Sequence, residues 1–115
     1  MHELSIAMSI VDLAEEESQS RGGLRISAVH LRLGALAGVV RDALLSSYEI
    51  ACQDTALAGS QLVIEEVPGM VYCPACAAAR PVRGAEWFCC STCGAIASEI
   101  VQGKELEVVS LEVEW

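Results

Sequence analysis

The sequence predicts an α+β fold in which two helices pack on a small mixed β-sheet, with a separate insert before the last strand. Apolar residues change from helical to strand-like spacing twice before residue 70. The segment 70–103 is instead rich in cysteine and glycine and has too few large apolar residues for a core. Residues 104–115 again alternate like a strand. We therefore expect one domain over 1–69, an inserted domain over 70–103, and a last strand over 104–115 that returns to the first domain.

Two segments have the spacing of amphipathic helices. In 4–17 the predicted apolar stripe is Leu4, Ala7, Met8, Val11 and Ala14. A polar break over 18–23 ends in two glycines, which is typical of a helix stop. The second helix is predicted over 42–54, where Cys52 is expected to be a small buried residue.

Three segments are predicted to be strands: 24–33, 62–67 and 106–115. The apolar phase of the last one shifts between Val108 and Val109. A bulge at these two residues would place both apolar sets on the same face.

Charge and hydropathy exclude several classes of protein. Sixteen acidic and seven basic residues give a net charge of -9, which disfavours binding to a phosphate backbone. The mean hydropathy is +0.43, but the longest nearly apolar run, 33–40, is far shorter than a membrane-spanning helix. No basic stretch precedes an apolar segment at the N-terminus, so we expect a cytoplasmic protein with no membrane partner.

Four of the six cysteines form two close pairs, in the pattern C-x2-C-x13-C-x2-C. Two residues between thiolates allow one tight turn to direct both sulfurs at a common point, and two such turns complete a tetrahedron. The predicted ligands of a structural zinc are Cys73, Cys76, Cys90 and Cys93. Two disulfides or a redox pair are the alternatives. The inserted domain is thus expected to be zinc-ribbon-like, with rubredoxin-like knuckles. Because all four ligands are sulfur, no position is left open for catalysis.

Several neighbours of the cysteine pairs bear on this prediction. Gly94 suits the turn after the second pair, whereas Ala77 follows the first and is expected to strain it. Cys89 could pair with Cys93 in place of Cys90, but three residues would then separate the two sulfurs, and this spacing fits a knuckle less well. Arg80 and Arg83 could offset the negative charge of four thiolates, or they could be ordinary solvated side chains.

The N-terminus could bind a second metal. The Met1 amine, the His2 backbone nitrogen and the His2 imidazole can close two chelate rings around one ion. Such a planar nitrogen set suits square-planar Ni(II) or Cu(II). Glu3 would supply the fourth ligand, through its carboxylate or its backbone nitrogen. An exposed surface histidine is the alternative interpretation of His2.

Taken together, these motifs resemble the HypA/HybF family of nickel metallochaperones for [NiFe]-hydrogenase maturation. The resemblance covers nearly the whole chain and rests on the opening Met1-His2-Glu3-Leu4-Ser5, Arg32-Leu33-Gly34, the two cysteine pairs and Gly103-Lys104-Glu105-Leu106. It implies nickel at His2 and Glu3 and zinc at the four cysteines. It also implies partnership with a HypB-type GTPase, delivery to a hydrogenase large subunit directly or indirectly, and in some members service to urease.

Two other functions are weighed against a metallochaperone that has no catalytic turnover. A zinc-ribbon module for nucleic acids or proteins is allowed by the cysteines alone, but the net charge argues against nucleic acid. A redox or hydrolytic enzyme needs an open metal position or a paired nucleophile, and the sequence offers neither. Either a monomer or a homodimer is compatible with the sequence.

Overall fold

The computed structural model describes residues 2–82, 88–97 and 99–114, which form two compact units. The first unit comprises Met1–Leu31, Val39–Glu65 and Glu107–Trp115, and the second comprises Arg32–Gly38 and Glu66–Leu106. No helix in the described part of the chain is long and apolar enough to cross a membrane.

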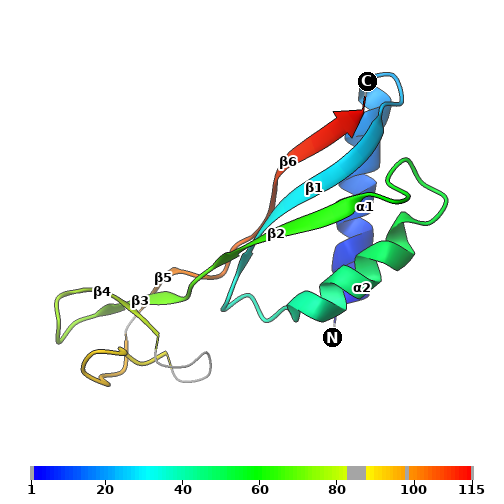
Figure 1. Ribbon diagram of the computed structural model, residues 1–115. Coiled ribbons are helices and arrows are strands. Elements are labelled where there is room, and N and C mark those ends of the chain that lie inside the picture. The colour runs from blue at the N-terminus through cyan, green and yellow to red at the C-terminus, as the bar shows by residue number, and fades with distance from the viewer. Residues whose placement is uncertain (1, 83–87, 98, 115) are drawn as a thin grey trace. The chain divides into compact units, whose positions relative to one another are not determined.

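A three-stranded sheet carries the fold of the first unit. Its order is β2-β1-β6, with β1 at Arg25–Gly34, β2 at Gln61–Val67 and β6 at Leu106–Glu114. Figure 1 shows β1 between the other two strands. The N–H of Ile26, at the start of β1, donates to the Ala56 carbonyl, which precedes β2. The N–H of Ala35, just after β1, donates to the Val67 carbonyl at the end of β2. The two strands therefore run in the same direction and are parallel.

The last strand runs the other way. Gly34, at the end of β1, bonds to Glu105, just before β6, and Ser27 near the start of β1 bonds to Glu112 near the end of β6. This antiparallel pairing beside a parallel one makes the sheet mixed, and the predicted fold class is confirmed.

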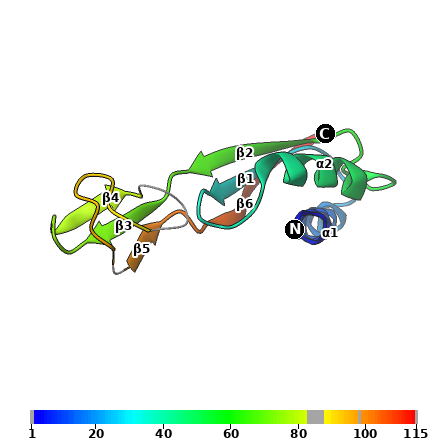
Figure 2. The ribbon, with the colours of Figure 1, turned by 90° about the horizontal axis from the view of Figure 1, so that it is seen from below.

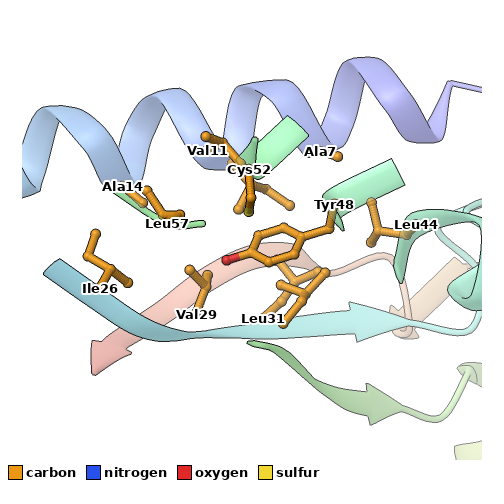
Figure 3. Close-up of a cluster of buried hydrophobic side chains, with 12 residues drawn as sticks. Ala7, Val11, Ala14, Ile26, Val29, Leu31, Leu44, Tyr48, Cys52 and Leu57 are labelled. Atoms are coloured by element: carbon orange, nitrogen blue, oxygen red, sulfur yellow. The ribbon is translucent and has the colours of Figure 1, made fainter. Parts of the chain in front are cut away.

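Two helices cover one side of this sheet: α1 at Glu3–Ser20 and α2 at Arg41–Cys52. Their buried side chains meet those of the strands in a single core, which Figure 3 shows between the helices and the sheet. Its most deeply buried large members are Tyr48, Ile26, Leu31, Leu44, Leu57 and Val29. Cys52 is 3% exposed in this core, which confirms the prediction for that residue.

The buried face of α1 differs from the predicted stripe. Leu4 and Met8 are 47% and 53% exposed, so their predicted place in the core is wrong. The helix instead buries Glu3, Ala7, Ile10, Val11, Ala14 and Ser18. Apolar residues lie on several sides of this helix, and spacing alone therefore did not define which side faces the sheet and α2.

In β6 the alternation of core-facing and exposed residues is interrupted later than predicted. Val108, Leu111 and Val113 pack against the core, but Val109 is 47% exposed. A bulge that brings Val108 and Val109 to one face is therefore wrong, and the change of face falls between Val108 and Leu111. Trp115, the last residue of the strand predicted over 106–115, lies outside the described residues.

A second three-stranded sheet, with order β4-β3-β5, forms the second unit. It consists of β3 at Met70–Cys73, β4 at Ala78–Pro81 and β5 at Glu99–Gln102, and β3 is antiparallel to both neighbours. Three glycines of this unit, Gly34, Gly69 and Gly103, lie in close backbone contact. A Cβ at Gly34 would overlap the Gly103 carbonyl, and a Cβ at Gly103 would lie 2.7 Å from the Gly69 Cα.

Candidate metal centre

Four cysteine sulfurs converge in the second unit. The sulfurs of Cys73, Cys76, Cys90 and Cys93 all lie within 4.8 Å of one another. Cys73 Sγ lies 3.4 Å from Cys93 Sγ, and Cys76 Sγ lies 3.9 Å from Cys90 Sγ. A tetrahedral zinc with Zn–S near 2.3 Å requires sulfurs about 3.8 Å apart. The four residues therefore fit a tetrahedral thiolate-bound metal.

A β-hairpin positions the first pair. Cys73 is the last residue of β3 and Ala78 is the first of β4, and the two face each other across the hairpin. The turn between them carries Cys76, whose backbone N–H donates to Cys73 Sγ at 3.4 Å. Ala77 completes the turn with φ of 54°, in the left-handed region that favours glycine. The strain expected at this alanine thus has a structural cause.

The second pair sits in a similar turn. Gly94 has φ of 78° and its N–H donates to the Cys90 carbonyl at 2.8 Å. The N–H of Thr92 donates to Cys90 Sγ at 3.4 Å. Backbone hydrogen bonds from Cys93 and Thr92 lower the pKa of the Cys90 thiol to about 6, because they stabilise the thiolate. The thiolate is the form that binds metal.

The N-terminal residues lie at the start of α1, in the first unit. His2 is exposed and directly precedes the helix, and its carbonyl accepts the Ile6 N–H at 3.0 Å. Glu3 is only 6% exposed, and its Oε2 accepts a hydrogen bond from the Val40 N–H at 3.0 Å. Met1 lies outside the described residues. The His2 imidazole is thus accessible to a metal, while the Glu3 carboxylate is engaged with the protein.

Comparison with known proteins decides the family. The family model for hydrogenase/urease nickel incorporation, metallochaperone, hypA matches residues 1–113. The chain belongs to the HypA family. The hydrogenase maturation factor HypA of Chloroflexus aurantiacus is 53% identical over 112 residues, covering 97% of this chain and 98% of the relative. That of Geobacter metallireducens is 46% identical over 114 residues, covering 99% and 100%. The predicted family is confirmed.

Solved structures of the HypA family share the fold. A solution structure of the Ni metallochaperone HypA from Helicobacter pylori matches with a TM-score of 0.66 at 23% identity, over 98% of this chain and 97% of that one. A second solution structure of a HypA protein gives a TM-score of 0.62 at 22% identity, over 99% and 97%. The family match does not favour the alternative of a zinc-ribbon module for nucleic acids or proteins.

Two residues considered from the sequence, Cys89 and Arg80, and one further histidine, His30, can now be placed in this HypA-family chain. Cys89 pairs with Ile96 in a β-bridge, and its sulfur is not among the four that converge in the described part of the unit. The buried Nε of Arg80 has no hydrogen-bond partner among the described residues, and Arg83 lies outside them. His30 Nε2 lies 2.6 Å from Glu112 Oε2, within hydrogen-bonding distance, on the sheet of the first unit.

Nothing in the sequence indicated that Val40 contacts the N-terminal residues. Val40 is 37 positions from Glu3 and holds its carboxylate through a backbone N–H. Because every residue except proline has such a donor, its side chain carried no signal of this contact.

Proposed function

We propose that this protein is a nickel metallochaperone that binds Ni(II) at its N-terminus and delivers it for the maturation of [NiFe]-hydrogenase. The match to the HypA family model over residues 1–113 is the observation that carries this proposal. Urease is a second recipient, since the family description names both enzymes. The proposed partners are a HypB-type GTPase and, directly or indirectly, the hydrogenase large subunit, and the proposed compartment is the cytoplasm. The protein itself has no catalytic turnover.

Each region has a separate role in this proposal. Residues 1–69 form the nickel-binding domain, 70–103 the zinc-binding domain, and 104–115 the strand that returns to the first. The proposed zinc ligands are Cys73, Cys76, Cys90 and Cys93, whose sulfur spacing supports a closed tetrahedral site. When bound there, zinc would add on the order of 10 kcal/mol of folding free energy to a unit with few large apolar residues.

The nickel ligands are the Met1 amine, the His2 backbone nitrogen, the His2 imidazole and a group of Glu3. The first N–H groups of a helix have no intrahelical acceptor, so deprotonating one breaks no helical hydrogen bond. The Glu3 carboxylate already accepts the Val40 N–H, which favours the Glu3 backbone nitrogen as fourth ligand. Because the ligands must lose protons to bind, nickel affinity falls in acid, and a site at a chain end can be captured stepwise by a receiving protein.

Titration of protein with a native N-terminus by Ni(II), followed by d–d absorption, tests this proposal. We expect one equivalent of a yellow, diamagnetic complex, since four planar nitrogen ligands give low-spin Ni(II). His2→Ala should abolish it, whereas His30→Ala, which removes the histidine paired with Glu112, should not. Glu3→Gln should change the spectrum little if the backbone nitrogen binds.

An uncleaved N-terminal tag provides the complementary test. It converts the Met1 amine to an amide and removes one chelate arm, so binding should weaken or change spectrum. Equal binding and equal spectra for tagged and untagged protein would exclude the amine. A paramagnetic six-coordinate complex that survives His2→Ala would place nickel elsewhere and contradict the N-terminal site.

A further inference from the structure

A groove lies in the first unit between the last turn of α1 and the ends of β1 and β6. It has a volume of about 340 Å³. Its apolar lining comes from the two strands and the segment before them: Leu24, Ile26, Leu111 and Val113. Glu17 of α1 and Arg21, the residue just after that helix, form one side, where Arg21 Nε donates to Glu17 Oε1 at 2.8 Å. The groove therefore offers an apolar floor beside a charged rim.

The strand next to this groove is at the edge of its sheet. In the order β2-β1-β6, β6 pairs with β1 on one side only, and no described strand pairs with its other side. Figure 2 shows β6 at the opposite edge of the sheet from β2. An edge strand presents unpaired N–H and C=O groups that can pair with another extended chain. The groove and the open backbone of β6 thus lie side by side.

Side chains of β6 alternate between two chemistries. Leu111 and Val113 line the groove, whereas Glu112 and Glu114 are exposed on the other face. A chain added along β6 would have the same alternation, because successive side chains of a strand point to opposite faces. Its apolar residues would enter the groove, and its other residues would lie beside the glutamates.

The charge of β6 decides between two kinds of occupant. Next to the groove the strand exposes Glu112, which lies beside His30, and Glu114, and no lysine or arginine lies between residues 106 and 114. A second copy of this chain would bring like charges together across the new strand pair, which is destabilising. A segment with lysine or arginine at alternate positions would instead form opposite-charge pairs.

We infer that β6 and this groove form a docking site for an extended segment of a partner protein in which apolar and basic residues alternate. The segment extends the sheet by pairing with β6, and its apolar side chains fill the groove. The site lies at the end of α1 opposite His2, about 25 Å away along the helix axis. A partner bound there leaves the N-terminus accessible, so the inference does not depend on the nickel site.

A short synthetic peptide of alternating lysine and valine is the probe. NMR of the full, metal-loaded protein should show shifts at Ile26, Leu111 and Val113 and slower amide exchange along β6. Two control peptides are matched to it. One replaces lysine with glutamate, and the other keeps the charge but carries a central proline, which removes a backbone donor. Neither should bind at the concentration at which the first does.

Charge reversal supplies the matched variant. Glu114→Lys, at an exposed position, should weaken the lysine peptide about fivefold. His2→Ala should leave peptide binding unchanged, which separates this inference from the proposed nickel function. Equal binding of the proline peptide, or no binding of the lysine peptide, would overturn it. Concentration-dependent shifts along β6 without peptide would also overturn it, because they would assign the edge to a second copy of the chain.

Discussion

The Val40 backbone N–H donates a hydrogen bond to Glu3 Oε2 at 3.0 Å, which joins the first residue of α1 to the residue that caps α2. Both helices pack into the same core, and this bond links the start of α1 to the start of α2. Glu3 is buried although it carries a charge, and its neighbour His2 is exposed. The proposed ligand His2 thus directly precedes a helix whose first residue is held by a hydrogen bond to Val40.

Glu3→Ala should lower the melting temperature by a few degrees, because it leaves the Val40 N–H without its acceptor. Glu3→Gln should lower it less, since an amide oxygen still accepts that bond. Glu16→Ala, at an exposed position of the same helix, is the control and should change little. Thermal unfolding followed by circular dichroism measures all three. Equal melting temperatures for Glu3→Ala and Glu16→Ala would show that the contact does not stabilise the fold.

Cys76→Ala should remove most of the bound zinc and open the second unit, because one of four converging sulfurs is lost. Cys93→Ala should do the same, whereas Cys89→Ala should retain one zinc per chain. Metal analysis of purified protein gives the zinc content. Full zinc occupancy in both Cys76→Ala and Cys93→Ala would refute the ligand assignment. Loss of zinc from Cys89→Ala would favour Cys89, in place of Cys90, as the ligand paired with Cys93.

Ala77→Gly should stabilise the second unit by about 1 kcal/mol, since glycine adopts the left-handed conformation without the Cβ penalty. Ala75→Gly provides the matched control in the same turn, because Ala75 does not have a positive φ. It should be neutral or destabilising. Amide exchange over residues 70–82 reports the difference. No gain for Ala77→Gly over Ala75→Gly would mean that the turn is not strained.

Gly103→Ala should destabilise the second unit strongly. Its φ is 117°, and an added Cβ would approach the Gly69 backbone and the Leu36 side chain. Gly22→Ala is the informative comparison, because Gly22 also has a positive φ of 88° but nothing lies within 4 Å of its added Cβ. Denaturant unfolding should show a smaller loss for Gly22→Ala, of about 1 kcal/mol. Equal losses would assign the whole effect at Gly103 to backbone conformation.

Tyr48 should make the first unit sensitive to alkali. Its hydroxyl lies 2.7 Å from Ser60 Oγ, and burial raises the pKa of Tyr48 above its usual value. Because the unfolded chain ionises this tyrosine at about pH 10, folding stability is present below that pH and declines above it. Tyr48→Phe should lose about 1 kcal/mol at neutral pH through the missing hydrogen bond.

The same variant should lose less stability than the parent between pH 9 and 11, so the difference between them should shrink as the pH rises. Urea unfolding at a series of pH values measures this. Tyr72→Phe, in the second unit, controls for the loss of a tyrosine hydroxyl. A constant difference between Tyr48→Phe and the parent across this range would show that the buried phenol does not control alkaline stability.

Local spacing was sufficient to predict much of this protein. The helices over 3–20 and 41–52 and the three strands of the first sheet were predicted within a few residues. The four cysteines that converge were also named from their spacing, because a tight turn requires two residues between ligands. These features depend on residues that are close together in the chain, where periodicity and turn geometry act directly.

Contacts between distant residues were decided by the tertiary structure alone. Leu4 and Met8 satisfied the helical period yet are exposed, because the sheet and α2 select which side of α1 is buried. The short strands β3, β4 and β5 lack a periodic pattern and exist through pairing with one another. The burial of Glu3 depends on a backbone donor 37 residues away. Such contacts form only when distant parts of the chain have folded together. The sequence of a single helix or strand does not specify which distant residues will pack against it.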